Sequence, residues 1–218
     1  MPGLPAARAD ARKKTLRADE REREDVREER AGYAERMRGL DPHRLVFVDE
    51  AGAATDLTRT HARAPRGRRA YGSAPAGRWR RLTVLGAPAA DGVAAAMTIE
   101  RATDTAVFCA FLDRVLIPEL VRTRPDAVVI MDNLSPHGAP VVRRKLERAG
   151  LGPLYLPRNS PDLSPIEPMW AKLKALLRAA AARTVAVLDA AVGDALARVT
   201  ADDAGGFFRG CGYAAPAN

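Results

Sequence analysis

Long apolar runs and closely spaced cysteines are both missing from this 218-residue sequence. No run approaches the roughly 18–20 apolar residues of a membrane-spanning helix, and the N-terminus lacks the apolar core of a signal peptide. We therefore expect a soluble cytoplasmic protein with no membrane contact. The two cysteines, Cys109 and Cys211, are far apart, so neither a disulfide framework nor a Cys-x-x-Cys zinc motif is indicated.

Acidic residues are also absent over a long stretch, from residue 57 to residue 90. That stretch contains eight arginines, whose summed charge equals the net charge of the whole chain, +8. They are Arg59, Arg63, Arg66, Arg68, Arg69, Arg78, Arg80 and Arg81. Such a concentration of positive charge attracts polyanions, so we expect this segment to bind nucleic-acid phosphates. A solvated loop is the alternative, and Trp79 within it is compatible with a core position.

Composition divides the chain into three parts. Residues 1–43 are rich in balanced opposite charges and poor in large apolar side chains, which predicts a solvated helix or a linker. Residues 44–214 contain the apolar runs that a buried core needs and are expected to form one globular domain. Residues 215–218 are expected to be a short tail.

The order of apolar patterns within the globular part predicts an α/β fold. Short apolar runs predict strands, and apolar residues spaced by three and four predict helices. The expected strands are residues 45–48, 82–86, 93–99, 127–131 and 154–156. The expected helices are residues 103–121, kinked or ended at Pro118, 135–149, begun by Ser135 and Pro136, 165–182 and 184–200, with a loop from Gly205. Three strands before the first helix suit an antiparallel meander, and the whole order implies a mixed sheet flanked by helices.

Two aspartates share one kind of position. Asp49 and Asp132 each follow a short apolar run, at the expected end of a buried strand. Ligands of open α/β sheets gather at the carboxyl ends of strands, so the two carboxylates meet if their strands are neighbours. Adjacent carboxylates repel unless they share a proton or a cation, and oxygen ligands favour Mg²⁺ or Mn²⁺. Taken singly, either aspartate could instead be an ordinary turn residue.

Glu167 is a third acid whose pattern has two interpretations. Ser164-Pro-Ile-Glu167 matches a capping box, in which the glutamate bonds back to the start of its helix. On a helical wheel, Glu167 also borders the apolar stripe, in line with Lys174 and Arg178. That position suits an acid of a metal site with phosphate-binding bases beside it, while a solvated face of charged pairs stays open as the alternative.

Three ordered motifs give the sequence a family resemblance. They are FVDE at residues 47–50, IMDNLSPH at 130–137 and YLPRNSPDLSPIEPMWAKLK at 155–174. Together with the 34 residues between Asp132 and Glu167, they resemble bacterial insertion-sequence transposases of the mariner-related DDE superfamily, the IS six-thirty type. The resemblance covers almost the whole globular part, including APRGRR at 64–69 and RGCGYA at 209–214.

This resemblance implies an RNase H-like fold with a mixed five-stranded sheet whose first three strands are antiparallel. It also implies a catalytic triad of Asp49, Asp132 and Glu167 that binds two Mg²⁺ or Mn²⁺ ions, cuts DNA at transposon ends and joins the freed 3′-hydroxyl to target DNA. From their charge and position, the residues that we expect to contact DNA are Arg66, Arg68, Arg69, Arg80, Arg81, Lys174 and Arg178. Those expected to support the triad are Glu50, Asn133 and His137, although His137 could also be a polar residue in a helix first turn.

Departures from the family narrow this expectation. Ser164 replaces a common Asn and Pro136 a more usual Ser, without changing an acid. Relatives carry N-terminal helix-turn-helix domains, whereas 44 residues precede the first expected strand here. We therefore expect the catalytic half of a nucleoid-associated transposase, a homodimer on DNA, encoded by a truncated copy or completed by an upstream helix-turn-helix reading-frame product. The alternatives are a catalytically silent DNA-binding or regulatory fragment and a host nuclease of the same fold.

Overall fold

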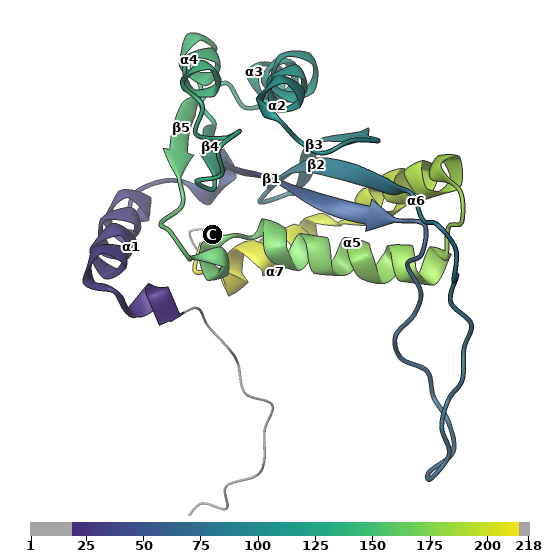
Figure 1. Ribbon diagram of the computed structural model, residues 1–218. Coiled ribbons are helices and arrows are strands. Elements are labelled where there is room, and N and C mark those ends of the chain that lie inside the picture. Colours follow the sequence, from purple (N-terminus) through teal and green to yellow (C-terminus); the bar gives the residue numbers. More distant parts are fainter. Residues whose placement is uncertain (1–18, 214–218) are drawn as a thin grey trace, which may run out of the picture.

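The computed structural model describes residues 19–213, in which five strands form one mixed sheet ordered β3-β2-β1-β4-β5 (Figure 1). The strands are β1 (Leu45–Ala54), β2 (Arg81–Ala89), β3 (Gly92–Ile99), β4 (Val128–Met131) and β5 (Gly152–Tyr155). The pairs β1–β2 and β2–β3 are antiparallel, whereas β1–β4 and β4–β5 are parallel. The predicted RNase H-like sheet, with its antiparallel first three strands, is therefore confirmed.

Helices cover both faces of the sheet (Figure 1). One face carries α2 (Thr105–Phe111), α3 (Ile117–Thr123) and α4 (Pro140–Arg148), and the other carries α5 (Ile166–Ala180), α6 (Val185–Ala197) and α7 (Ala201–Gly210). No helix in the described part of the chain is long and apolar enough to cross a membrane. The sheet thus lies between two apolar layers, as the sequence predicts.

Side chains alternate along β1, so neighbouring residues face opposite sides of the sheet. Phe47 packs in the cluster that contains the helix α5, and Val48 packs in the cluster on the α2 side. Because side chains alternate along a strand, Asp49 faces the α5 side and Glu50 faces the α2 side. The two acids are therefore neighbours in sequence but belong to different layers.

The length of β1 differs from the prediction. The expected strand ends at Val48, but β1 continues through Asp49 to Ala54 because these residues pair with β2. The continuation consists mainly of alanine and glycine, so its apolar signal is weak. The parallel neighbour β4 does end where expected, at Met131. Asp132 therefore follows a strand end, whereas Asp49 lies within a strand.

Two helix boundaries were predicted wrongly. The helix expected from Ser135 begins only at Pro140, because residues 134–138 form a turn in which His137 and Gly138 both donate to the Leu134 carbonyl. The loop expected from Gly205 is the helix α7. Its start is fixed by a capping box between Thr200 and Asp203. This box and the burial of an apolar face offset the roughly 1 kcal/mol that each helical glycine costs.

The expected helix 103–121 is present with an interruption. A π-helical segment, η3 (Leu112–Leu116), joins α2 to α3, and Pro118 lies in the first turn of α3. Proline lacks the N–H for an i→i−4 bond, so the preceding turn widens rather than breaks. The helix therefore does not end at Pro118 but continues to Thr123, and the interruption precedes the proline.

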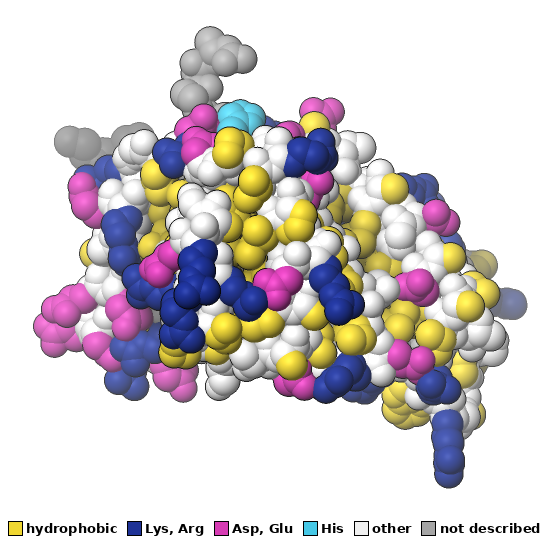
Figure 2. All heavy atoms as spheres, turned by 90° about the horizontal axis from the view of Figure 1, so that it is seen from above, with side chains coloured by type: hydrophobic (Ala, Val, Ile, Leu, Met, Phe, Trp, Pro, Cys, Tyr) yellow, Lys and Arg dark blue, Asp and Glu magenta, His cyan; other side chains and the backbone are white. Residues whose placement is uncertain are grey.

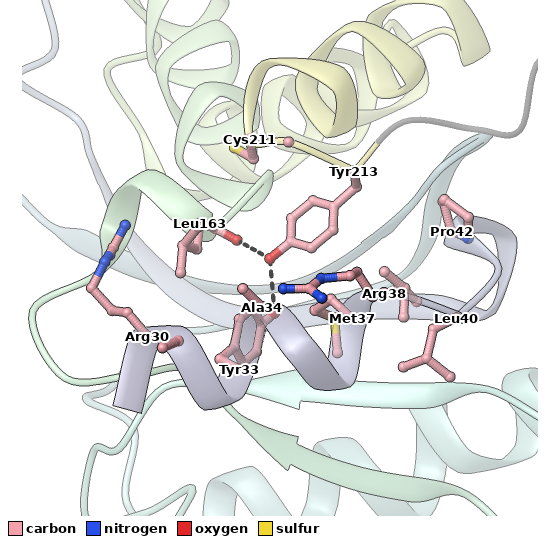
Figure 3. A pocket seen from close by; sticks show the side chains of 13 residues that line it. Arg30, Tyr33, Ala34, Met37, Arg38, Leu40, Pro42, Leu163, Cys211 and Tyr213 are labelled. Carbon is pink, nitrogen blue, oxygen red and sulfur yellow. Dashed lines mark hydrogen bonds between the residues drawn. The ribbon is translucent and has the colours of Figure 1, made fainter. Parts of the chain in front are cut away.

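The helix α1 (Glu24–Met37) precedes the sheet. Its residues Val26 and Tyr33 are each 1% exposed, and Tyr33 belongs to the core cluster on the α5 side. It is a helix, as one of the two predictions for residues 1–43 had it, but it is docked rather than solvated. Residues 1–18, and the tail at residues 215–218, lie outside the described residues. The hydroxyl of Tyr33 lies 2.8 Å from that of Tyr213, and both residues line a pocket of about 480 Å³. Figure 3 shows the two side chains pointing toward one another.

Candidate active site

The parallel register between β1 and β4 brings the two aspartates together. Val48 pairs with Met131, so the next residues, Asp49 and Asp132, occupy equivalent places on adjacent strands. Both line a cleft of about 410 Å³ that Glu167, from the first turn of α5, also lines. Three acids from three separate elements therefore share one cleft.

Asp49 is held by a tryptophan. The indole N–H of Trp170, on α5, donates a hydrogen bond of 3.1 Å to the Asp49 Oδ2 atom. Burial raises the pKa of Asp49 to about 6, although hydrogen bonds from the Glu50 backbone and Trp170 oppose this rise. The nearby charges of Glu50 and Asp132 raise it further. A carboxylate in such surroundings is stabilised by a nearby cation.

His137 connects the two layers of the site. Its Nδ1 atom lies 2.5 Å from Asp132 Oδ1, and its Nε2 atom lies 3.0 Å from Glu50 Oε2. Burial lowers the pKa of His137, but the hydrogen bonds with Asp132 and Glu50 outweigh burial and raise it to about 9. The fully buried ring also packs against Phe108, with centroids 4.4 Å apart. His137 is thus a buried cation between two acids, not a polar residue in a helix first turn.

The same contacts affect Asp132. Burial raises the pKa of Asp132, but hydrogen bonds from His137 and the Leu134 backbone outweigh burial and leave this pKa below its ordinary value. Asn133, which also lines the cleft, donates from its side chain to the Leu156 carbonyl at 2.7 Å. His137 therefore contacts both Asp132 and Glu50, and Asn133 lines the cleft, while the support of these three residues for the triad stays a prediction.

Glu167 is free of the capping role that its sequence pattern allows. The residue before the helix is Pro165, and no side chain caps this end of α5. The contact with Ser164 is between backbone atoms only, from the Glu167 N–H to the Ser164 carbonyl at 3.2 Å. The carboxylate of Glu167 therefore remains available to the cleft.

The acids do not converge on one point. Within residues 19–213, no group of three His, Cys, Asp or Glu side chains is placed closely enough to hold a metal ion. The donor set nevertheless fits a hard cation, because it consists of carboxylate oxygens. Trp170 and His137 each bond to one oxygen of their aspartate, so each carboxylate keeps an oxygen for a cation. A cation that bound all three acids would therefore require them to move closer together.

Sequence reasoning missed two residues near the cleft. Trp170 is 3% exposed and fits an apolar helical stripe, so only its position one turn after Glu167 could have indicated its contact with Asp49. Arg158 lines the cleft within the third motif but carries no signal that distinguishes it from other exposed arginines. It donates hydrogen bonds to Glu29 and Asp25, both more than one hundred residues earlier in the chain.

The basic segment forms an exposed excursion between β1 and β2, here called the basic arm (residues 59–80), in which every residue is exposed. It extends away from the body of the domain in Figure 1. Arg66, Arg68 and Arg69 lie within it, whereas Arg80 forms an ion pair with Glu100 at its base. Trp79 is 50% exposed, so the core position considered for it is wrong.

The remaining basic residues are less concentrated. Arg81 begins β2 and is exposed, and Lys174 and Arg178 are half-buried on α5, the helix that carries Glu167. On the face that carries α2, α3 and α4, Lys and Arg side chains are interspersed with acids and apolar groups (Figure 2). The basic arm is therefore the part of the chain with the most one-sided charge.

Comparisons with known proteins agree with this geometry. The model of the family described as DDE superfamily endonuclease matches residues 44–189. No curated protein matches the sequence at a significant level. Among solved structures, the chain is similar to the Mos1 transposase in a paired-end complex with the left transposon end, with 21% identity and a TM-score of 0.72 over 96% of this chain and 63% of that chain.

Two further Mos1 structures are similar to the chain. A mariner Mos1 paired-end complex with Mg has 21% identity and a TM-score of 0.69, over 95% of this chain and 64% of that chain. The isolated catalytic domain has 18% identity and a TM-score of 0.65, over 91% of each chain. The chain thus spans less than two thirds of the longer Mos1 chains, and at these identities the likeness concerns the fold. By its family match, the chain belongs to the DDE superfamily of endonucleases.

Proposed function

We propose that this chain is the catalytic part of a transposase, which cleaves DNA at the ends of an insertion sequence and transfers the freed strand to target DNA. The observation that carries the proposal is that Asp49, Asp132 and Glu167, from β1, the end of β4 and α5, line one cleft. Membership of the DDE superfamily supports the same chemistry.

The proposed cofactors are two Mg²⁺ or Mn²⁺ ions. Bound there, such ions would activate the attacking oxygen and stabilise the charge that develops on the phosphate. The chain would hold them through the carboxylates of Asp49, Asp132 and Glu167. His137 would keep Asp132 in one orientation, while the buried Trp170 excludes water from one side of Asp49. Mos1 structures with Mn and with Mg support the choice of ions.

DNA is the proposed partner. We assign phosphate contacts to Arg66, Arg68 and Arg69 of the basic arm, to Arg80 and Arg81 at its base, and to Lys174 and Arg178 beside Glu167. The paired-end complex of Mos1 with a transposon end supports DNA binding, and a homodimer on DNA is the assembly that we propose.

The experiment is a nicking assay on supercoiled DNA with Mg²⁺ or Mn²⁺. Asp132→Asn and Glu167→Gln should each reduce cleavage by orders of magnitude, because the metal supplies both nucleophile activation and charge stabilisation. Matched controls are Asp194→Asn and Glu28→Gln, since both acids are exposed and have no ion-pair partner within residues 19–213. Equal cleavage by the site variants and the controls would refute the proposal.

A second candidate function is a catalytically silent fragment that binds DNA or regulates an intact transposase. The failure of three acids to converge favours it. This candidate predicts DNA binding with no metal-dependent nicking by the unaltered chain. The nicking assay therefore separates the two functions without further variants.

A further inference from the structure

We propose that Trp170 is a positioning residue for the candidate metal site. Trp170 fixes the carboxylate of Asp49, and Gly86 provides the space in which the Trp170 ring lies. The inference rests on the proposed function, because it concerns how the cation ligands are held. It adds to the acids of the cleft a residue that contacts neither DNA nor metal.

The first step is the register of the sheet. Asp49 is directly paired with Gly86 across the β1–β2 ladder. Cross-strand partners point to the same face of a sheet, so any side chain at residue 86 would project beside Asp49. Glycine has no such side chain, and the space on the α5 side of β2 next to Asp49 stays open.

The Trp170 ring fills that space. A Cβ atom added to Gly86 would lie 2.6 Å from the Cη2 atom of Trp170 and 3.2 Å from the Cε atom of Met169. The first distance is shorter than real Cβ contacts allow. The ring is 3% exposed and belongs to the core cluster on the α5 side. Because it is enclosed on all these sides, the indole cannot turn away from Asp49 without disturbing the core.

Trp170 also links Asp49 to Glu167. Trp170 follows Glu167 by three residues, so the two side chains lie on neighbouring positions of the same helix surface. The indole N–H then joins α5 to β1 through its 3.1 Å bond to Asp49 Oδ2. The Trp170 side chain therefore connects β1, which carries Asp49, to α5, which carries Glu167.

The chemical consequence concerns ligand orientation. An uncharged N–H donor occupies one oxygen of Asp49 and restricts rotation of the carboxylate, while the other oxygen stays available to a cation. Groups that orient metal ligands in this way typically change metal affinity by about 10–100-fold when they are removed. Trp170→Phe removes the N–H and retains most of the apolar ring.

The test measures Mn²⁺ binding without DNA, by electron paramagnetic resonance of the free ion. We expect the dissociation constant of Trp170→Phe to rise by about 10–100-fold. The matched control is Trp79→Phe, the same change at the only other tryptophan, which is exposed and should bind Mn²⁺ as the unaltered chain does. Unchanged Mn²⁺ affinity in a folded Trp170→Phe would overturn the inference.

A second variant tests whether loss of Mn²⁺ binding comes from the Asp49 contact and not from a folding defect of Trp170→Phe. Gly86→Ala retains the indole but displaces it from Asp49, so it should weaken Mn²⁺ binding in the same direction. In the Trp79→Phe chain, the emission of Trp170 should also be quenched by bound Mn²⁺, and absence of quenching would count against the contact. If the unaltered chain binds no Mn²⁺, the proposed metal-dependent function itself fails, an outcome distinct from loss of binding in the variants alone.

Discussion

Arg158 donates hydrogen bonds to Glu29 from both its backbone N–H, at 3.2 Å, and its guanidinium, at 2.6 Å. A second pair joins the same two parts of the chain, because Arg30 of α1 bonds to Asp162 at 2.9 Å. Arg158 lines the candidate cleft, and Asp162 lies in the short helix η4 (Pro161–Leu163) between the cleft and α5. The helix α1 thus holds one wall of the cleft, although it precedes the sheet in sequence.

The first prediction concerns this wall. Glu29→Gln should increase amide hydrogen exchange in residues 157–164, because Arg158 loses one of its two acidic partners and keeps only Asp25. The global free energy of unfolding should fall by less than about 1 kcal/mol, since the pair is solvent-exposed. Hydrogen–deuterium exchange with mass spectrometry gives the first quantity and urea denaturation the second. Glu28→Gln, a neighbouring exposed acid, is the control, and equal exchange in both variants would contradict the prediction.

The second prediction follows from His137. Its pKa is raised in the folded state to about 9 from 6.5, so its stabilising contribution is complete below about pH 6.5 and is lost as pH rises through about 9. His137→Gln should therefore destabilise the chain more at pH 6 than at pH 9.5, with a difference of at most about 3 kcal/mol. Urea denaturation at the two pH values measures it. The control is His43→Gln, the same change at an exposed histidine.

The third prediction follows from Asp49. Its folded-state pKa, about 6, is above the ordinary 3.8, so the folded protein binds the proton more tightly and loses stability as pH rises between these values. Without metal, Asp49→Asn should increase stability at pH 7.5 by roughly 1–3 kcal/mol. The gain should vanish near pH 4, where the aspartate is protonated. Thermal denaturation in a chelator tests this, and a gain of equal size at both pH values would contradict the assigned cause.

The fourth prediction concerns the basic arm. Replacing Arg66, Arg68 and Arg69 with Gln should weaken binding to all DNA sequences and flatten its salt dependence, by about 0.9 in log–log slope for each phosphate that the arm no longer neutralises. Fluorescence anisotropy over a range of salt concentrations measures the slope. The control is a triple variant at the exposed arginines Arg122, Arg198 and Arg209, which should retain the original slope.

Part of this architecture is predictable because it depends on local patterns. The apolar run before Asp132 predicts both the strand β4 and its end, and the stripe of α5 predicts that helix. The capping box of α7 is also local, but the three glycines of this helix mask it by weakening the helical pattern. The second half of β1 is masked in another way, since its alanines and glycine are held mainly by pairing with β2.

The unpredicted contacts join residues far apart in sequence. Trp170 and Asp49 are 121 residues apart, and Arg158 and Glu29 are 129 apart. Nothing near Trp170 in sequence distinguishes an indole that bonds to an acid from one that only fills the core. The decisive neighbour is Gly86, whose missing side chain has meaning only once the register of the sheet is known. The acids of the site are thus easier to predict than the groups that hold them.

The strand β1 carries Asp49 near its middle and leads directly into the basic arm. A strand rises about 3.3 Å per residue, so a pull on the arm would act on the carboxylate through a stiff connection of roughly 17 Å. Arg183 interrupts that transmission, because its guanidinium bonds to the carbonyls of Thr55 and Leu57 at 3.0 and 2.9 Å. The chain is therefore anchored just beyond the sheet, so the arm can move while Asp49 keeps its place.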